Sequence, residues 1–451
     1  MLLCAEYVLP ITSEPIHRGA VLVQGDAIKD IGKADILKLR YPEEEVHDYG
    51  RAAIMPGLLD LHSHMENAVL RGLVKDCDFS TWVMNVGKMQ ARLSAEDRLD
   101  SAVLCGMEAV SNGVTTIADF STTGSDCAAV SKLGMRAFIY REVGAMDKRR
   151  VDFAMTAAAN DIDRWGQDYG SSLVTIGIAP AEVYSVHPAV FGHVAEFATK
   201  ENIPMSLHLA GSQAEVDFVR FGSSPFSVHG LGEGRGFVEI PPWMPTGTTP
   251  IRYALNWGAL EAPNVMVVHA VHADDYDISK LREYGVSVAT CPRCNAQLGM
   301  GVAPLMEFIS NGIPFGFGTD SPAAAGSADI LAEIRTGLLI QRAVNVGNFI
   351  DASSMLEYAT MGAARALKIE DKVGSLEIGK LADIIAVDFS SSRQMPLLDP
   401  VSTVVNACSG DDVVMTMING KVLYEHDEWH LDFDMSLNVE RAARLREKLR
   451  K

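Results

Sequence analysis

An apolar run closes on two histidines in the stretch Met55-Pro56-Gly57-Leu58-Leu59-Asp60-Leu61-His62-Ser63-His64. On a β-strand, side chains two residues apart point to the same face, so His62 and His64 would project together from the end of a buried strand. Two imidazoles held in this way can bind one divalent metal ion. A strand end with two solvated histidines is the alternative, and ligands at other strand ends would distinguish the two.

Short apolar segments alternate with helical patterns, such as that of residues 97–104, through the centre of the chain. The eight predicted strands are 54–61, 114–119, 136–141, 173–179, 203–208, 265–269, 286–290 and 314–319. Eight β-then-α units predict an α/β fold, a (β/α)8 TIM barrel, in which functional residues lie at the carboxyl ends of the strands. A doubly wound sheet is the alternative architecture.

Both ends of the chain are rich in predicted strands. Near the N-terminus, Gly25-Asp26 separates two apolar runs as a hairpin turn would, and Asn419-Gly420 does the same near the C-terminus. A polar amphipathic helical pattern follows. The pattern predicts a composite β-sandwich of residues 1–55 and 373–431, a barrel of residues 56–372, and a C-terminal helix within 432–451.

Three further predicted strands end in side chains that can bind a metal. His208 closes the fifth strand, His269 the sixth and Asp320 the eighth. A carboxylate buried at such a place without a cation would be costly. Together with His62 and His64, these residues predict a metal site on one rim of the barrel.

Charge and cysteine content limit the partners and the compartment. The 451 residues include 39 basic and 58 acidic ones, a net charge of −19 that disfavours nucleic acid or an anionic membrane as partner. Seven scattered cysteines, an odd number, are typical of reduced thiols. With no signal-peptide pattern and no transmembrane-length apolar run, the sequence predicts a cytoplasmic protein that acts on a small molecule.

The chain resembles the amidohydrolase superfamily over nearly its whole length. The resemblance is carried by Pro56 to His64, Val268-His269-Ala270-Val271-His272, residues 291–299 (CPRCNAQLG), Gly318-Thr319-Asp320-Ser321-Pro322 and residues 373–383 (VGSLEIGKLAD). It is closest to the cytosine/guanine deaminase and chlorohydrolase branch. Within that branch, His64-Met65-Glu66, residues 214–218 (AEVDF) and the segment from Trp243 to Tyr253 are similar to aminodeoxyfutalosine deaminases.

The resemblance implies a site and a reaction. One divalent ion, Zn²⁺ or alternatively Fe²⁺, would be held by His62, His64, His208 and Asp320, and would make hydroxide available at neutral pH. Asp320 would accept the proton of the water, and His269 would orient the nucleophile. The implied enzyme is a deaminase of a heterocyclic or nucleoside-like amine, and the family suggests a homodimer.

Two departures from the family pattern leave other functions open. Deaminases of this branch usually place a glutamate three residues after the third histidine, where this chain has Gly211, and they often carry His-Ala-Pro-Tyr where it reads Pro180-Ala181-Glu182-Val183-Tyr184. One alternative is therefore a hydrolase of a cyclic or linear amide, or of another C–N or C–Cl bond that needs no ring protonation. The other is a metal-binding barrel without turnover.

The predicted substrate-binding residues come from several parts of the chain. They are Glu66, Trp82, Glu142, Glu182, Tyr184 and Trp243. The first three could equally be structural. Residues 221–250 form a long segment rich in glycine and proline directly after the His208 strand. Long segments of this kind often cover functional sites, so we expect this one to lie over the metal site.

Overall fold

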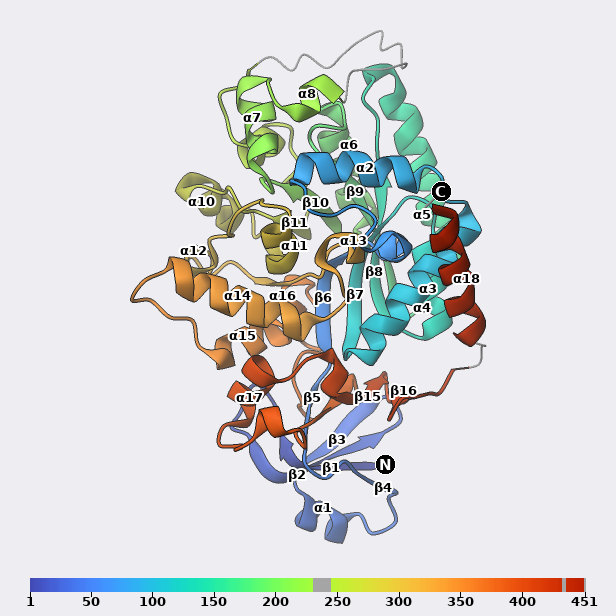
Figure 1. Cartoon of the computed structure of the whole chain (residues 1–451), viewed down its shortest axis with the longest axis vertical. Helices are drawn as coiled ribbons and strands as arrows, with labels where there is room; N and C mark the ends of the chain where they lie inside the picture. Colours follow the sequence, from blue (N-terminus) through green and yellow to red (C-terminus); the bar gives the residue numbers. More distant parts are fainter. Residues whose placement is uncertain (230–244, 432–434, 450–451) are drawn as a thin grey trace.

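The computed structural model describes residues 1–229, 245–431 and 435–449, and it contains two β-sheets (Figure 1). An eight-stranded parallel sheet lies in the middle of the molecule with helices around it. A nine-stranded, largely antiparallel sheet lies at one end, where the N-terminus is also found. Among the described residues, no helix is both long and apolar enough to cross a membrane.

The central sheet is the predicted barrel. Its strands follow one another in sequence order, each parallel to the next: β6 (Leu58–Ser63), β7 (Val114–Ser121), β8 (Arg136–Val143), β9 (Val174–Pro180), β10 (Met205–Leu209), β11 (Val265–His269), β12 (Ser287–Thr290) and β13 (Phe315–Phe317). Ser63 forms a parallel bridge with Asp320, and the Asp320 N–H donates to the carbonyl of His62 at 2.8 Å. This contact brings the last strand back to the first, and the (β/α)8 architecture is confirmed.

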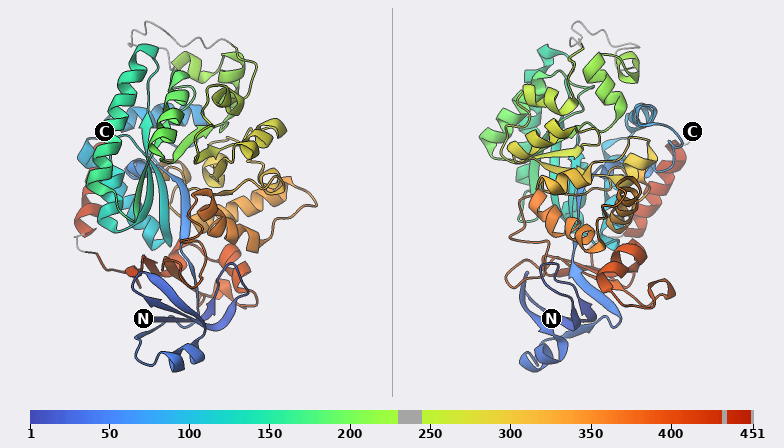
Figure 2. Two further views of the ribbon diagram at one scale, coloured as in Figure 1. Left: turned by 180° about the vertical axis from the view of Figure 1, so that it is seen from behind. Right: turned by 90° about the vertical axis from the view of Figure 1, so that its left-hand side faces the viewer.

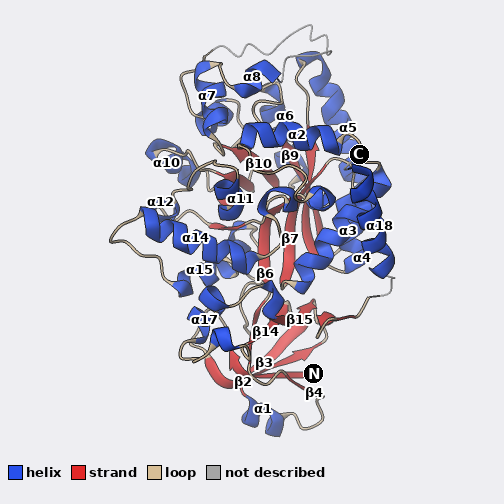
Figure 3. Cartoon of the chain, viewed as in Figure 1, coloured by secondary structure: helices blue, strands red, loops and turns tan. Residues whose placement is uncertain are grey.

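Helices cover the outside of the barrel, as the secondary-structure colouring of Figure 3 makes clear. The helix α3 (Ala95–Ser111) includes the predicted 97–104 pattern and begins with a capping box, in which Ser94 and Asp97 each accept a backbone N–H of the other. The main later helices are α4 (Ser125–Leu133), α5 (Val151–Tyr169), α6 (Ala189–Glu201), α10 (Asp275–Glu283) and α14 (Ile330–Val344).

The two ends of the chain build the other sheet together. Its strands are β1 (Leu2–Val8), β2 (Ile16–Gln24), β3 (Ala27–Lys33), β4 (Val46–Asp48), β5 (Ala52–Pro56), β14 (Ile384–Asp388), β15 (Val413–Ile418), β16 (Lys421–Glu425) and β17 (Glu428–Trp429). The strand β5 lies between β1 and β14 and so joins the N-terminal strands to the C-terminal ones. Seen from behind, the sheet closes off the end of the barrel opposite α7 and α8 (Figure 2). The division into domains at residues 55 and 372 stays a prediction.

The first predicted strand, 54–61, is in fact two strands that belong to different sheets. The chain passes from β5 to β6 at Gly57, whose N–H donates to the carbonyl of Asp383 at 2.9 Å. A Cβ atom at Gly57 would lie 2.1 Å from the side chain of Thr115, so no larger residue fits without a shift. The apolar run is continuous because both strands are buried, which hides the break from a reading of hydrophobicity.

Two further segments were expected outside the barrel strands, a C-terminal helix and a cover over the metal site. The C-terminal helix α18 (Met435–Leu449) lies along α3, where Asn438 donates to the carbonyl of Asp100 at 3.0 Å (Figure 1). The segment 221–250 contains the end of α7 (Gln213–Phe221), the helix α8 (Pro225–His229) and the first residue of α9 (Pro250–Asn256). Residues 230–244, with Trp243, lie outside the described residues, so the predicted cover stays a prediction.

Candidate metal centre and substrate pocket

The four histidines and the aspartate of the predicted site come together at the carboxyl end of the barrel. His62 is near the end of β6 with His64 just beyond it, and His208 and His269 lie at the ends of β10 and β11. The Nε2 atoms of His62 and His208 are 3.2 Å apart. Asp320 follows β13 and reaches the same point from the other side of the barrel closure.

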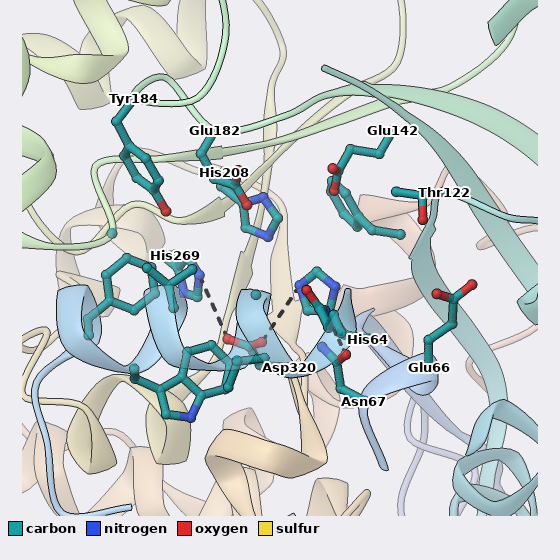
Figure 4. A pocket seen from close by; sticks show the side chains of 18 of the residues that line it. His64, Glu66, Asn67, Thr122, Glu142, Glu182, Tyr184, His208, His269 and Asp320 are labelled. Atoms are coloured by element: carbon teal, nitrogen blue, oxygen red, sulfur yellow. Dashed lines mark hydrogen bonds and ion pairs between the residues drawn. The ribbon is translucent and has the colours of Figure 1, made fainter. Parts of the chain in front are cut away.

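The carboxylate of Asp320 faces three of these imidazoles. Its Oδ1 atom lies 3.8 Å from Nε2 of His62. The same atom lies 3.9 Å from Nε2 of His64, and the Oδ2 atom lies 3.8 Å from Nε2 of His269 (Figure 4). The ligand atoms of His62, His64 and His208 lie within 4.8 Å of one another, and so do those of His62, His269 and Asp320. Either set could hold a metal ion.

The protonation of the buried histidines suits a metal ion. Burial, followed by the neighbouring imidazoles, lowers the pKa of His62 and of His208 well below the ordinary value. Both rings are therefore neutral, which is the form that binds metal. Neutral imidazole nitrogens with one carboxylate oxygen are a donor set that zinc takes in proteins.

Unusual backbone conformations occur at the ends of the ligand-bearing strands. The φ angle is +73° at His269, +46° at Ala270, +56° at Asp320 and +54° at Ala210. Positive φ angles at residues other than glycine are unfavourable and persist where the surroundings impose them, often at functional sites. The hydrogen bond from Asp320 to the His62 carbonyl is one such restraint.

Asp60 ties the first metal-bearing strand to the last. Its carboxyl accepts the Thr319 N–H at 3.0 Å, the Thr319 hydroxyl at 2.5 Å and the His62 N–H at 3.2 Å. Burial raises the pKa of Asp60 to about 7 even though these donors oppose the shift. The sequence analysis assigned Asp60 no role, although its position two residues before His62 places it on the same face of the strand.

Asn295 fixes the orientation of His269. Its Oδ1 atom lies 3.1 Å from Nδ1 of His269, and the Asn295 side chain is only 2% exposed. If Nδ1 carries the proton and donates it to this oxygen, Nε2 is left free to face Asp320 and the centre of the site. Asn295 lies in the quoted CPRCN motif, but nothing in its spacing pointed to His269.

A cavity of about 450 Å³ opens over the cluster, within the usual range for a small-molecule site. Its lining includes five of the six residues predicted to bind substrate, Glu66, Trp82, Glu142, Glu182 and Tyr184, together with His64, His208, His269 and Asp320. The sixth, Trp243, lies outside the described residues. The structure therefore brings the described members of the predicted site into one pocket, except for His62, which lies buried beside it.

Glu66 lines this pocket but is already engaged by other side chains. Its carboxylate accepts the Arg98 guanidinium and the Thr123 hydroxyl, each at 2.5 Å. Figure 4 shows the Glu66 carboxyl directed away from His64. The interaction with Arg98 spans 32 residues, and no sequence signal identified it.

The carboxyl group of Glu215 lies close to Gly211, which has no side chain of its own. Glu215, on the first turn of α7, folds back so that its carboxylate accepts the N–H groups of Ala210 and Gly211, both at 2.8 Å. Burial raises the pKa of Glu215 to about 7, partly opposed by these N–H donors. A Cβ atom at Gly211 would lie 3.1 Å from the His269 ring and 3.1 Å from Met300, so the loop is close-packed there.

Glu142 lies near the end of β8 and Glu182 follows the adjacent strand β9, and the two residues influence each other. Burial, and then the charge of Glu182, raise the pKa of Glu142 to about 8. Glu182 accepts a hydrogen bond from the Ser185 hydroxyl at 3.0 Å. The hydroxyl of Tyr184 is buried without a hydrogen-bond partner among the described residues, and the Tyr184 ring stacks on Phe226 at 3.8 Å.

A closed β/α barrel with such a cluster at its carboxyl end defines the class of metal-dependent barrel hydrolases. The chain belongs to the amidohydrolase family, whose profile matches residues 53–423. It is therefore an enzyme of that family, and the resemblance read from the sequence motifs is confirmed.

Curated relatives share the whole architecture. The chain is 28% identical over 425 residues to a 5-methylthioadenosine/S-adenosylhomocysteine deaminase of Moorella thermoacetica, covering 93% of both chains. It is 30% identical over 415 residues to the enzyme of the same name from Pelotomaculum thermopropionicum, covering 90% of this chain and 88% of the relative.

Solved structures show the same fold with zinc bound. An adenosine deaminase of Xanthomonas campestris with bound zinc superposes with a TM-score of 0.85 at 25% identity, covering 100% of this chain and 98% of the other. Atrazine chlorohydrolase of Arthrobacter aurescens, complexed with zinc, gives a TM-score of 0.82 at 21% identity over 99% of both chains, which shows the fold. The zinc in these neighbours and the donor set described above support a divalent metal in this protein.

Proposed function

We propose that this protein is a metal-dependent aminohydrolase that removes an amino group from a heterocyclic or nucleoside-like compound. The observation that carries the proposal is a cluster of four histidines and one aspartate, of which His64, His208, His269 and Asp320 line one cavity and His62 lies buried against them. The relatives named as deaminases of 5-methylthioadenosine and S-adenosylhomocysteine support this type of substrate.

The metal in this proposal is one zinc ion per chain, with iron as the alternative. His62, His64, His208 and Asp320 would hold it, and the ion supplies Lewis acidity that makes water nucleophilic at neutral pH. In this proposal Asp320 would accept the proton of the attacking water. His269 would hydrogen-bond the oxygen that attacks, which its contacts with Asn295 and Asp320 support.

Gly211 supports a second candidate, a hydrolase whose substrate needs no ring protonation. Ring deamination calls for a proton on a ring nitrogen as the amine leaves, and Gly211 has no group to supply it. Glu215 is close in space, yet both of its oxygens accept backbone N–H groups. Hydrolysis of an amide, or of another C–N or C–Cl bond, would not need a proton on a ring nitrogen. The remaining alternative, a barrel without turnover, would bind metal and release no product.

The other predicted properties fit a small-molecule enzyme. The net charge of −19 supports the prediction that nucleic acid and anionic membranes are not partners. All seven cysteines are free, and six of them are buried, which supports the cytoplasmic location that we propose. A homodimer remains part of the proposal on the basis of the family alone.

An ammonia-release screen on zinc-loaded protein tests the proposal. The panel contains amino-purines, amino-pyrimidines, pterins, adenosine and 5-methylthioadenosine, with amides and chlorinated triazines as a second set. Ammonia from the first set supports the aminohydrolase, and products from the second set alone support the other hydrolase. Stoichiometric zinc with no product from either set would contradict both.

A further inference from the structure

The cavity is lined by more carboxyl groups than arginine or lysine side chains. Arg98 is the one arginine or lysine among the described lining residues, and it is paired with Glu66 at 2.5 Å. The carboxylate of Glu215 is held by two backbone N–H groups, and Asp320 faces the histidines. Glu142 and Glu182 are the two carboxyl groups left without a cation.

These two residues are adjacent because their strands are paired. Val143 lies opposite Pro180 in the β8–β9 register, and the Ala181 N–H donates to the carbonyl of Val143 at 2.9 Å. Arg141 is the nearest cation in the sequence, but its guanidinium is directed to Asp161, with Nε 2.9 Å from Oδ2. It also hydrogen-bonds the Glu142 carbonyl, so it is only partly available to the Glu142 carboxyl.

Buried polar groups without partners lie beside the pair. The Tyr184 hydroxyl has no hydrogen-bond partner among the described residues, and Figure 4 shows it pointing into the pocket. The indole N–H of Trp82, a lining residue that is 7% exposed, also has no partner in the described chain. A buried polar group without a partner is unfavourable, so a ligand that offers complementary groups would be stabilised here.

We infer that Glu142, Glu182 and Tyr184, which we call the carboxylate wall, bind a cationic nitrogen group of the substrate, an ammonium or an amidinium. This inference rests on the proposed function and names the class of substrate for the same pocket. An ammonium has three N–H donors, enough for the two carboxylates and the Tyr184 oxygen. Its charge also offsets the repulsion that arises when both carboxyl groups are ionised, which the Ser185 hydroxyl alone does not.

A second cavity beside the first one favours the opposite charge on the substrate and so defines the competing outcome of the test. It has a volume of about 710 Å³, shares Thr122 and Glu142 with the main cavity, and carries Arg150. A substrate that extended past Glu142 to Arg150 would benefit from a negative charge instead. Of the carboxylate wall, only Glu142 lines both cavities, whereas Glu182 and Tyr184 line the main cavity alone.

Binding of three matched compounds to the zinc-loaded full chain tests the inference. Adenosine, 5′-amino-5′-deoxyadenosine and adenosine-5′-carboxylate carry a neutral, a cationic and an anionic group at the same position. Calorimetry at pH 7 should give about tenfold tighter binding of the amine than of adenosine, and weaker binding of the carboxylate. Equal affinities, or the carboxylate binding most tightly, would overturn the inference.

Substitutions assign the effect to the wall. Glu142→Gln and Glu182→Gln should each reduce the preference for the amine over adenosine by at least about threefold. The control is Glu196→Gln on α6, an exposed glutamate outside this cavity, which should leave the preference unchanged. A preference that survives both wall substitutions would overturn the assignment, and if either variant fails to fold, the wild-type order of affinities still decides.

The outcome is separable from that of the proposed reaction because the order of affinities among the three compounds and the release of ammonia are two separate measurements. A cation preference in a protein that releases no ammonia would contradict the deaminase proposal and support the wall. Ammonia release with no preference among the three compounds would do the opposite.

Discussion

The two sides of the pocket are built in opposite ways. At the metal centre the side chains are tied to one another and to the barrel, through Asp60 to Thr319 and through Asn295 to His269. At the carboxylate wall, the Tyr184 hydroxyl has no hydrogen-bond partner among the described residues, and Glu182 accepts a hydrogen bond from the Ser185 hydroxyl. The difference teaches that the reaction centre is preorganised by the protein, whereas the wall is completed by its ligand.

The largest effect is expected at the metal centre. His62→Ala and Asp320→Ala should each lose the metal or reduce turnover by about a thousandfold or more, because each removes a ligand. Elemental analysis and ammonia release measure the two losses. His193→Ala, an exposed histidine on α6, is the control and should keep both. Wild-type protein that is metal-free and active with chelator present would contradict the metal requirement, and with it the contrast between the two sides of the pocket.

A smaller effect is expected where the protein orients a reacting group. Asn295→Ala should lower kcat by about 10–100-fold with little change in KM, because His269 loses the partner that sets its ring orientation. The pH profile of kcat should also shift, which a purely structural defect would not cause. Asn295→Asp, which keeps an acceptor oxygen, should recover part of the rate; no recovery with an unshifted profile would argue against the orienting role.

Gly211 lies between the two sides and tests whether ring protonation limits the rate. Gly211→Glu should raise the rate of deamination of adenosine at least about tenfold if the missing carboxyl is limiting. Gly211→Ala is the matched control, because it brings the same crowding against His269 and Met300 without a carboxyl. If both variants are slower than wild type, protonation is supplied by another group.

The smallest effect concerns stability at the carboxylate wall. The pKa of Glu142 in the folded protein is raised to about 8, above its ordinary value of 4.5, so its contribution to stability is lost as the pH rises from about 5 to 8. Glu142→Gln should therefore make the fall in Tm between pH 5 and 8 less steep. Thermal unfolding across this range measures the slope, and an unchanged slope would mean that the repulsion is relieved in another way.

The cluster of candidate metal ligands could be predicted from the sequence because each of its members lies at or just beyond the end of an apolar strand. His62, His64, His208, His269 and Asp320 are placed by local periodicity and by the rule that strand ends share one rim. The pattern of apolar residues also located all eight strands of the barrel. It could not find the break at Gly57, since hydrophobicity runs unbroken from one buried strand into the next.

The residues that the sequence left without a role act through long-range or folded-back contacts. Asn295 reaches His269 across 26 residues, Arg98 reaches Glu66 across 32, and Glu215 returns to the backbone at Gly211. Such contacts depend on the tertiary packing of loops and leave no periodic signal. The placement of Glu142 beside Glu182 likewise requires the register of β8 and β9.

The direct passage from β5 to β6 at Gly57 has a consequence for how the enzyme is made. The strand that carries His62 is continuous with one that pairs with Ile384 to Asp388, and its far end is bridged to Asp320. A ribosome therefore releases the first metal ligands long before the segments that hold them in place. These long-range pairings make folding slow and leave the nascent barrel unable to complete its site until nearly the whole chain has emerged.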